Sequence, residues 1–400
     1  MKVLQFTKEY PPNVYGGAGV HIEYLSRELS KLMEVEVRCF DELNIDLEHL
    51  KVTGFTATTK NEITVDKKIA SLLKTLSTNI NMNLDDVEAD IIHCHTWYSH
   101  FSGILAKILY RKPLIITAHS LEPLRPWKRE QLGNGYDLSS WIERTAIEMA
   151  DAIVAVSEET KEDLLKYFNL DENKVKVIYN GIDLEEYAFT EKKEVLEKYG
   201  IDSSLPYVLF VGRITRQKGI IHLVNAVKYL EKDIQVVLCA GMPDTDEIAK
   251  EMKDKVDEMN QAKQRIIWIP EMLPKAEVIQ LYSHATVFCC PSIYEPFGII
   301  NLEAMACNTA VVASAVGGIK EIIVQHETGI LVPLEQETTA PFEPVDGERF
   351  ANDLATAINR VVSDNEMRKH MELKSRERVE ELFSWSSIAL QTKKLYESLL

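Results

Sequence analysis

Short apolar runs rich in valine and isoleucine alternate with longer amphipathic segments along this chain. In the first half, the runs that predict strands cover residues 3–6, 35–40, 91–94, 114–117, 152–156 and 175–178. In the second half, they cover residues 207–211, 235–239, 265–269, 287–290, 311–314 and 330–332. Alternation of strands and helices is typical of parallel sheets with helices on both faces. The sequence therefore predicts an α/β fold with two doubly wound parallel-sheet domains.

The length agrees with two domains, because 400 residues exceed one ordinary domain and suit two of about 150–200 residues each. We place an N-terminal domain at residues 1–183 and a C-terminal domain at residues 205–383. The stretch between them is charged and poor in apolar runs. Open parallel sheets bind ligands beyond the carboxyl ends of their strands. Two such domains facing each other would enclose one central cleft.

Charge and hydropathy exclude several partners. The chain carries 62 acidic and 45 basic residues, a net charge of −17, which disfavours binding to nucleic acid or to an anionic membrane. No stretch approaches the roughly 18–20 apolar residues of a membrane helix, and the first apolar run is too short for a signal peptide. The six cysteines form no C-x-x-C pair, so we expect them to be reduced. These features predict a cytoplasmic protein.

A glycine-rich segment, Tyr15-Gly16-Gly17-Ala18-Gly19, follows the first predicted strand. Glycines let the backbone approach a ligand, and a helix N-terminus offers N–H groups to an anion. Ile22 stands where the dinucleotide fingerprint needs its third glycine, so the pattern disfavours an NAD enzyme. Phosphate binding and a plain turn remain open.

Two bases, Arg213 and Lys218, follow the first strand of the second half. In an acidic chain, such a pair suits a diphosphate, because Arg binds anions bidentately and Lys acts as a point charge. A solvated basic turn is the alternative.

Two glutamates, Glu295 and Glu303, flank a helix predicted to begin at Pro296. Eight helical residues separate them by about 12 Å, more than the ~5–9.5 Å between the paired carboxyls of a glycosidase. They are better suited to two parts of one elongated ligand, and the first helical N–H groups could take a phosphate. A capping glutamate with a second one by chance is the alternative.

Together these motifs resemble those of the retaining glycosyltransferases of family 4, which have a GT-B fold and include the glycogen-synthase-like enzymes. Glu295 and Glu303 match the motif E-x7-E, and Arg213 and Lys218 match G-R-x4-K-G. The segments 9–21, 95–98, 117–128 and 180–183 resemble, more narrowly, the group of actinobacterial-type glycogen synthases and α-maltose-1-phosphate synthases. The resemblance covers essentially the whole chain.

The resemblance implies a hexosyltransferase that needs no metal or cofactor. Its donor would be a nucleotide sugar, with ADP-glucose favoured and UDP-glucose left open. The main expectation is a retaining α-1,4-glucosyltransferase that extends glycogen or another α-glucan, a glycogen synthase. The alternatives are transfer to glucose 1-phosphate, which gives α-maltose 1-phosphate, and an inactive sugar-binding or regulatory protein. A C-terminal helix at 384–400 would cross back to the N-terminal domain.

The resemblance also implies roles for particular residues. The expected catalytic residues are His119, Arg213, Lys218 and Glu295. The expected donor-binding residues are Gly16, Gly17, Arg213, Lys218, Glu295, Gly298, Ile299, Ile300 and Glu303. Arg213 and Lys218 would hold the diphosphate, Glu295 the sugar hydroxyls and Glu303 the ribose.

The acceptor side is expected at His95, Trp97, Trp127 and Lys128. An aromatic ring beside a base suits a sugar phosphate, and it equally suits a glucan stacked on Trp127. His93 and His95 would face the same side of a strand, which is a ligand pattern that zinc accepts. No third or fourth ligand is evident nearby, so we expect no metal, and a buried structural histidine is the alternative.

Overall fold

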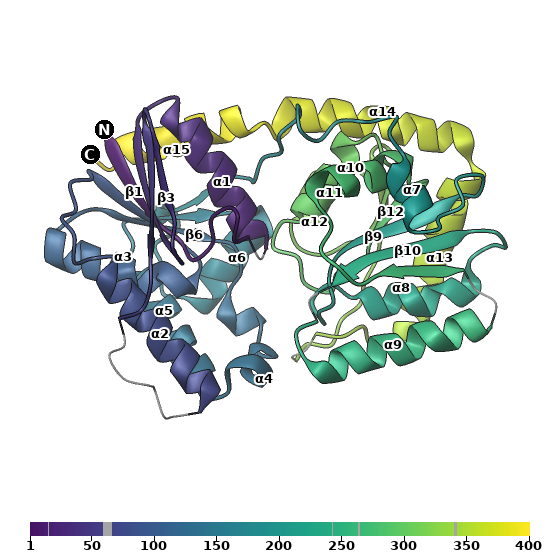
Figure 1. Ribbon diagram of the computed structural model, residues 1–400, viewed down its shortest axis with the longest axis horizontal. Coiled ribbons are helices and arrows are strands. Elements are labelled where there is room, and N and C mark those ends of the chain that lie inside the picture. Colours follow the sequence, from purple (N-terminus) through teal and green to yellow (C-terminus); the bar gives the residue numbers. More distant parts are fainter. Residues whose placement is uncertain (15, 59–65, 242, 263–264, 340–341) are drawn as a thin grey trace. The chain divides into compact units, whose positions relative to one another are not determined.

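The structure is a computed structural model (Figure 1), and it describes residues 1–14, 16–58, 66–241, 243–262, 265–339 and 342–400. The chain divides into two compact units. Unit 1 contains Met1–Gly181 and Trp385–Leu400, and unit 2 contains Ile182–Ser384. Unit 1 is therefore built from two separate stretches of the chain.

Unit 1 is built on an eight-stranded sheet in the order β3-β4-β2-β1-β5-β6-β7-β8. The strands are β1 (Lys2–Phe6), β2 (Glu34–Phe40), β3 (Asn44–Leu47), β4 (Leu50–Phe55), β5 (Ile91–His95), β6 (Leu114–Ala118), β7 (Ala152–Ala155) and β8 (Val175–Val177). Neighbouring strands pair in parallel, except that β3 pairs antiparallel with β4 at one edge. The central strands are buried on both faces, which is why they read as continuous apolar runs.

Helices cover both faces of this sheet. They are α1 (Gly17–Ser30), α2 (Lys67–Asn81), α3 (Trp97–Tyr110), α4 (Lys128–Leu132), α5 (Gly135–Met149), α6 (Glu158–Tyr167) and α15 (Trp385–Glu397). Figure 1 shows α1 and α15 together on one face and α2, α3 and α5 on the other. The aromatic ring of Trp385, at the start of α15, stacks on Tyr24 of α1 with ring centroids 5.6 Å apart.

The sequence pattern does not predict the β3–β4 hairpin or α2. β3 is the edge strand and pairs only with β4, which separates it from β2, and most residues of β3 are exposed. An edge hairpin needs few buried side chains, so its apolar pattern is weak.

Unit 2 is built on a six-stranded parallel sheet in the order β11-β10-β9-β12-β13-β14. The strands are β9 (Tyr207–Arg213), β10 (Gln235–Gly241), β11 (Ile266–Ile269), β12 (Val287–Cys290), β13 (Val311–Ser314) and β14 (Gly329–Val332). The helices are α7 (Glu194–Lys198), α8 (Ile220–Ala226), α9 (Asp246–Gln261), α10 (Lys275–His284), α11 (Ile299–Ala306), α12 (Ile319–Ile322), α13 (Gly347–Ser363) and α14 (Asn365–Leu382). Two doubly wound parallel-sheet units confirm the predicted fold class.

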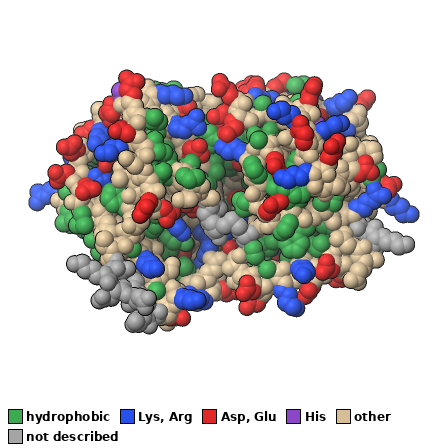
Figure 2. Space-filling model, viewed as in Figure 1, with side chains coloured by type: hydrophobic (Ala, Val, Ile, Leu, Met, Phe, Trp, Pro, Cys, Tyr) green, Lys and Arg blue, Asp and Glu red, His purple; other side chains and the backbone are tan. Residues whose placement is uncertain are grey.

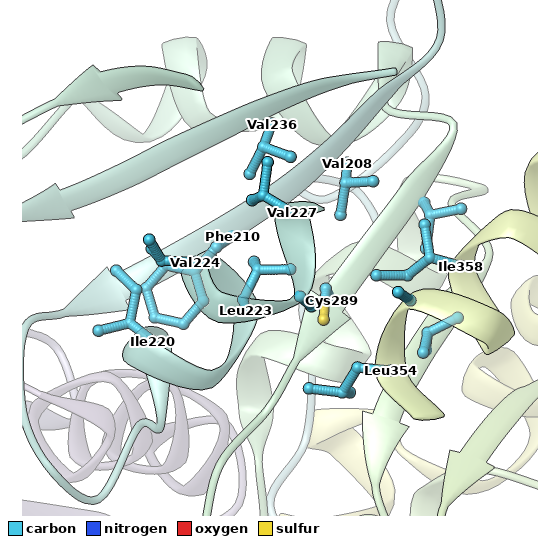
Figure 3. Close-up of a cluster of buried hydrophobic side chains, with 14 of the residues drawn as sticks. Val208, Phe210, Ile220, Leu223, Val224, Val227, Val236, Cys289, Leu354 and Ile358 are labelled. Carbon is cyan, nitrogen blue, oxygen red and sulfur yellow. The ribbon is translucent and has the colours of Figure 1, made fainter. Parts of the chain in front are cut away.

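The core of unit 2 lies between its sheet and the helices α8, α9 and α13. Figure 3 shows the part of it at α8 and α13. Val208 and Phe210 from β9 and Val236 from β10 pack toward these helices. Leu223 of α8 and Leu354 of α13 close the cluster, and both are fully buried. Burying a side chain of this size contributes roughly 1.5–3 kcal/mol, so this cluster holds β9 rigidly under the loop that follows it.

The segment between the two domains expected from the sequence belongs to unit 2. The Thr190 N–H donates to Ser283 Oγ at 3.1 Å, and the Val195 N–H donates to Gln280 Oε1 at 3.1 Å. These bonds tie residues around α7 to α10. The stretch resembles a linker in the sequence because it has no long apolar run; these polar contacts and the buried side chains of Val195 and Leu196 attach it.

Each sheet has one point where the strand order reverses. β1 lies between β2 and β5 in unit 1, and β9 lies between β10 and β12 in unit 2. At such a point, the loops after neighbouring strands diverge and leave a crevice at the carboxyl ends. The loops after β1, β5, β9 and β12 are therefore the positions where the topology favours ligand binding.

Across the described residues, no helix has the length and apolar character needed to span a membrane. Figure 2 shows acidic and basic side chains interspersed on the visible face, with apolar side chains between them. On this face, the acidic excess of the chain is spread out.

Candidate active site

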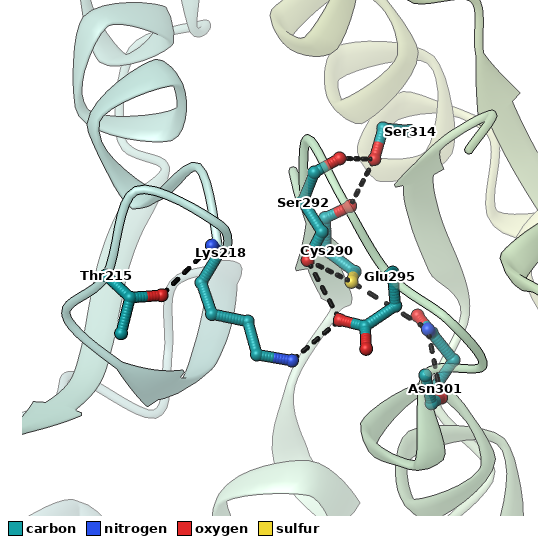
Figure 4. Close-up of polar contacts among 8 residues, drawn as sticks. Thr215, Lys218, Cys290, Ser292, Glu295, Asn301 and Ser314 are labelled. Carbon is teal, nitrogen blue, oxygen red and sulfur yellow. Dashed lines mark hydrogen bonds and ion pairs between the residues drawn. The ribbon is translucent and has the colours of Figure 1, made fainter. Parts of the chain in front are cut away.

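The turn from β9 to α8 carries the two predicted phosphate-binding bases. The Lys218 Nζ donates to Glu295 Oε2 at 2.6 Å, and the Lys218 N–H donates to Thr215 Oγ1 at 3.2 Å (Figure 4). Arg213 Nη1 donates to Asp244 Oδ1 at 3.1 Å. Each base therefore has a carboxylate partner within unit 2, and a diphosphate bound here would meet two bases that are already oriented.

Gly219 lets this turn lie against the end of β12. Its φ is +59°, and a Cβ at this position would lie 2.0 Å from the carbonyl oxygen of Pro291. A side chain cannot fit there, so glycine is required. This close approach brings Lys218 within reach of Glu295.

Glu295 lies in the loop after β12 and is buried. The Ser292 hydroxyl donates to its Oε2 at 3.1 Å, and the Gly318 N–H donates to its carbonyl oxygen at 3.1 Å. Gly317, with φ of +53°, packs so closely that a Cβ would lie 1.8 Å from the Glu295 carbonyl oxygen. Both the side chain and the backbone of Glu295 are therefore held in place.

Helix α11 begins at Ile299, with Gly298 as its N-cap, so the predicted helix start at Pro296 is wrong. The Asn301 Nδ2 donates to the Gly298 carbonyl at 3.1 Å and stabilises the non-helical residues before the helix. Ile299 and Ile300 form the first turn, where N–H groups have no acceptor within a helix. These groups suit an anion.

Glu303, also on α11, is held by two tyrosines. Tyr187 and Tyr282 donate their hydroxyls to its two carboxylate oxygens at 3.2 and 2.9 Å. Burial raises the pKa of the Glu303 carboxyl above its ordinary value. Carboxylate oxygens have further lone pairs, so Glu303 can still accept from a ligand hydroxyl. Tyr187 and Tyr282 are not among the residues predicted from the sequence.

In unit 1, the glycine-rich segment forms the start of α1. Gly17 is its first residue, and the Gly16 N–H donates to Glu9 Oε2 at 2.9 Å. Tyr15, part of the same motif, lies outside the described residues. The Gly16 N–H therefore already has an anionic partner from its own loop.

His119 follows β6, is half-buried, and forms a cluster of imidazoles with the buried His21 and His95. His95 Nδ1 and His119 Nε2 share a hydrogen bond at 3.1 Å. Burial lowers the pKa of His21 to about 4 and lowers the pKa values of His95 and His119 well below their ordinary value. These imidazoles are neutral at pH 7, so His119 is suited to hydrogen bonding rather than to protonating a leaving group.

A cavity of about 300 Å³ lies in unit 1 next to the carboxyl ends of its strands. Its lining includes Lys8 after β1, Trp97 and Tyr98 after β5, and Lys74 on α2. Asp41, Lys68 and several apolar residues complete it. The Lys8 Nζ lies 3.9 Å from the centre of the Tyr98 ring, and burial lowers the pKa of this ammonium. The cavity is therefore lined by both bases and aromatic rings.

Of the four predicted acceptor-side residues, only Trp97 lines this cavity. His95 lies in the histidine cluster, and Trp127 and Lys128 lie at the start of α4, where Lys128 donates to Gln131. Lys8 could have been identified from the sequence, since it lies two residues past the first strand. Lys68 and Lys74 could not, because the sequence pattern did not predict α2.

Comparison with known proteins identifies the family. Models named Glycosyltransferase Family 4 and Glycosyl transferases group 1 match residues 15–186 and 191–340. A curated relative from Mycolicibacterium smegmatis, alpha-maltose-1-phosphate synthase, is 46% identical over 99% of both chains. Sucrose-phosphate synthase from Thermosynechococcus elongatus has a TM-score of 0.80 and 25% identity, over 100% of this chain and 98% of that one. Anabaena HepE, solved with UDP-glucose, has a TM-score of 0.74 and 19% identity over 100% of both chains.

These relatives correct one expectation and confirm others. The main interpretation, a glycogen synthase, is wrong, because full-length relatives at 43–46% identity are alpha-maltose-1-phosphate synthases. ADP-glucose as the donor, the residue roles and the absence of a metal stay predictions. Curated relatives and family models agree that the protein is an enzyme that transfers hexose units. The chain belongs to the family 4 glycosyltransferases, hexosyltransferases with the GT-B fold.

Proposed function

We propose that this enzyme transfers glucose from a nucleoside diphosphate glucose to glucose 1-phosphate and so forms α-maltose 1-phosphate. The observation that carries the proposal is the cavity of unit 1, with Lys8, Lys68 and Lys74 around Trp97 and Tyr98. A sugar phosphate carries a charge of about −1.5 to −2 at pH 7. Lysines gathered in one cavity of a chain with a net charge of −17 favour that ligand over an uncharged glucan.

The acceptor would bind with its phosphate toward the lysines and its ring against Trp97. Lysine is a point charge without fixed geometry, so three lysines can hold a phosphate without bidentate contacts. Asp41, in the same lining, can accept from a sugar hydroxyl. The name shared by the relatives from the two mycobacterial genera supports the same acceptor.

The donor would bind in unit 2, with its diphosphate at Arg213, Lys218 and the first turn of α11. A nucleoside diphosphate is a stable leaving group, so its departure needs positive charge more than a proton. Lys218 is held in position by Glu295 at 2.6 Å, so little reorganisation is needed when the charge develops. Glu295 would in turn accept hydroxyl groups of the glucose.

The reaction breaks the bond between the anomeric carbon and the diphosphate oxygen. The new bond joins that carbon to the 4-hydroxyl oxygen of glucose 1-phosphate, with retention. The hydroxyl proton leaves with the diphosphate, which is basic enough to take it. Neutral His119 would donate or accept a hydrogen bond beside the reacting sugar.

The test measures release of nucleoside diphosphate from ADP-glucose and from UDP-glucose, each with glucose 1-phosphate or with glycogen. We expect glucose 1-phosphate to stimulate release and a phosphorylated disaccharide to form, and the faster donor identifies the nucleotide. Stimulation by glycogen alone, with label entering the polymer, would overturn the proposed acceptor. A matched acceptor control is unphosphorylated glucose, which should stimulate far less.

A further inference from the structure

Three imidazoles from distant parts of unit 1 meet at one point. His21 lies on α1, His95 ends β5 and His119 follows β6, and one ring nitrogen of each lies within 4.8 Å of the others. The ring centroids of His21 lie 5.3 Å from His95 and 4.7 Å from His119. The sequence suggested a different pair, His93 with His95, and offered no third ligand.

The hydrogen bonds of these rings leave nitrogens available. His21 Nδ1 bonds to the Asn180 side-chain oxygen at 2.5 Å, so Nδ1 carries the proton and Nε2 carries the lone pair. His21 Nε2 and His95 Nε2 are buried and have no hydrogen-bond partner within the part of the chain that the structure describes. Buried polar atoms without a partner are rare, because leaving them unpaired costs free energy.

His93 lies beside this cluster but does not qualify as a ligand. Its ring centroid lies 4.3 Å from that of His95, yet both of its nitrogens are bonded, to the Tyr396 hydroxyl at 2.7 Å and to Thr117 Oγ1 at 2.6 Å. A ring with both nitrogens bonded has no lone pair for another ligand. His93 is therefore a structural neighbour and a natural control.

We propose that His21, His95 and His119 bind one zinc-like divalent transition-metal ion and leave a fourth position open. Zinc bonds to imidazole nitrogen at about 2.0–2.1 Å, which at tetrahedral angles separates the ligands by about 3.3 Å. His95 Nδ1 and His119 Nε2 are already 3.1 Å apart. A metal would replace the hydrogen bond that they share, and the proton of His95 would then lie on Nε2, which has no partner among the described residues. Three histidines with an open position are a known zinc ligand set, and imidazole also suits copper and nickel but not magnesium or calcium.

The surroundings favour ligation in two further ways. Asn180 orients His21 through Nδ1, as outer-shell partners orient the histidines of metal sites. All three rings are neutral at pH 7, so the metal displaces no proton from a charged imidazole. His119 is partly exposed, which gives an ion a route of entry.

A bound metal would affect glucosyl transfer because His119 is one of its ligands. If His119 lies beside the donor glucose, as the proposed function has it, a bound metal occupies the ring that should contact the sugar. Loading the site should therefore inhibit glucosyl transfer. Only this consequence rests on the proposed function, because binding of the ion depends on the cluster alone.

The test uses the full chain after treatment with a chelator, titrated with Zn²⁺ by calorimetry and with Co²⁺ by visible absorption. We expect one ion per chain and a Co²⁺ spectrum typical of four-coordinate sites. His21→Gln should weaken binding at least about 100-fold, and Asn180→Ala about 10-fold or more. The controls His93→Gln and His326→Gln, the latter replacing a histidine outside the cluster, should bind as the unchanged protein does.

A second measurement needs no variant and so avoids any loss of folding. Zn²⁺ should shift the ring ¹⁵N signals of three histidines and leave those of His93 at their positions. Failure to bind Zn²⁺ below about 1 mM, or equal binding by His21→Gln, would overturn the site. One bound ion with full transferase activity would keep the metal site and would instead contradict the proposed position of His119.

Discussion

Glu295 and Lys218 depend on each other. Lys218 has a carboxylate 2.6 Å away in a largely buried position, and Ser292 donates to the same oxygen. Neutralising Glu295 keeps the shape of the side chain but removes the charge that orients Lys218. An ion pair in such a place is costly to break on one side only, because the remaining charge stays buried.

We therefore expect Glu295→Gln to lower kcat/KM by about 100-fold or more, the scale on which removing one preorganised electrostatic group slows a reaction. The far-UV circular dichroism should be unchanged. The measurement is the rate of nucleoside diphosphate release with both substrates varied. The control is Glu327→Gln, which replaces an exposed glutamate in unit 2. Near-normal rates for Glu295→Gln would mean that the donor site lies elsewhere.

A substitution of Lys74 tests whether glucose 1-phosphate is the acceptor. It lines the unit 1 cavity from α2, while Lys67 on the same helix does not. We expect Lys74→Met to raise the KM for glucose 1-phosphate about 10-fold, since a charge-assisted contact is worth roughly 1.5–3 kcal/mol. The KM for the donor should stay within about twofold of its original value. Lys67→Met is the matched control, and an equal effect of both variants would speak for general electrostatics rather than a phosphate contact.

His100 makes unit 1 sensitive to acid. It is buried, its two nitrogens have no hydrogen-bond partner among the described residues, and burial lowers its pKa to about 3. The unfolded chain binds a proton at this residue below its ordinary pKa of about 6.5, while the folded chain does not. The free energy of unfolding therefore falls as the pH drops from about 6.5 toward 3, by up to about 1.4 kcal/mol per pH unit from this group.

Replacing His100 by methionine should remove that dependence. We expect His100→Met to be as stable as the original protein at pH 8, and the stability difference to grow in its favour at lower pH. Urea unfolding at pH 8, 7, 6 and 5, in the presence of a chelator, measures how the free energy of unfolding of each protein depends on pH. Parallel slopes would show that His100 is protonated in the folded chain.

Some features of the candidate site could be predicted from the sequence, and others could not. The spacing of Arg213 and Lys218 after a strand, and of Glu295 and Glu303 around a helix start, marked positions that the fold places at one switch point. Sequence spacing could not show that Tyr187 holds Glu303, because they are 116 residues apart. Nor could it find the histidine cluster, whose members come from α1, β5 and the loop after β6.

At the scale of elements, the strands of both sheets could be predicted because parallel strands are buried on both faces and read as apolar runs. Elements at the sheet edges and in loops could not be predicted in this way. The β3–β4 hairpin and α2 have few buried residues, and α11 begins three residues after the predicted Pro296 because packing around Gly317 and Glu295 decides where the loop ends.

Substitution of Gly317 tests the close packing of this residue on Glu295. It has φ of +53°, and a Cβ would lie 1.8 Å from the Glu295 carbonyl oxygen. Gly317→Ala should lower stability by more than the roughly 1–2 kcal/mol that the left-handed conformation alone costs, and should displace Glu295. We expect the rate of transfer to fall at least about 10-fold in consequence, since a misplacement of 1 Å can cost about 100-fold.

The matched variant is Gly200→Ala. Gly200 has φ of +69° in the same unit, but no atom of the described residues lies within 4 Å of a Cβ there. Gly200→Ala should lose only the stability that the left-handed conformation costs, because no steric clash is added. It should keep full activity. Thermal unfolding and transfer rates of both variants separate the two contributions, and equal losses would contradict the role assigned to close packing on Glu295.

At the scale of the molecule, the chain passes between the units twice. It enters unit 2 at Ile182 and returns to unit 1 at Trp385, so α14 and α15 follow each other directly but belong to different units. The amphipathic pattern at the C-terminus does not by itself show the unit on which this segment packs; only the resemblance to family 4 enzymes predicted that it crosses back to the N-terminal domain. That assignment depends on contacts such as Trp385 with Tyr24 and Tyr396 with His93, which span most of the chain.

Removing residues 385–400 should therefore unfold unit 1 and leave unit 2 folded. The deletion strips Trp385, Ile388 and Tyr396 from the core of unit 1, and losing even one large aromatic side chain from a core costs about 3–5 kcal/mol. That is a large part of the 5–15 kcal/mol by which a typical domain is stable. Hydrogen exchange followed by peptide should show protection lost in β1, β2 and α1 but kept in β9 and β10.

Two controls make this deletion informative. Removal of Leu400 alone, an exposed residue, should change nothing. Tyr396→Phe, which keeps the ring but loses the hydroxyl bonded to His93, should destabilise unit 1 by only about 1 kcal/mol. If the deleted chain kept protection in β1 and α1, the C-terminal helix would be an accessory to unit 1 rather than part of its core. Lost protection in both units would mean that unit 2 also depends on a folded unit 1.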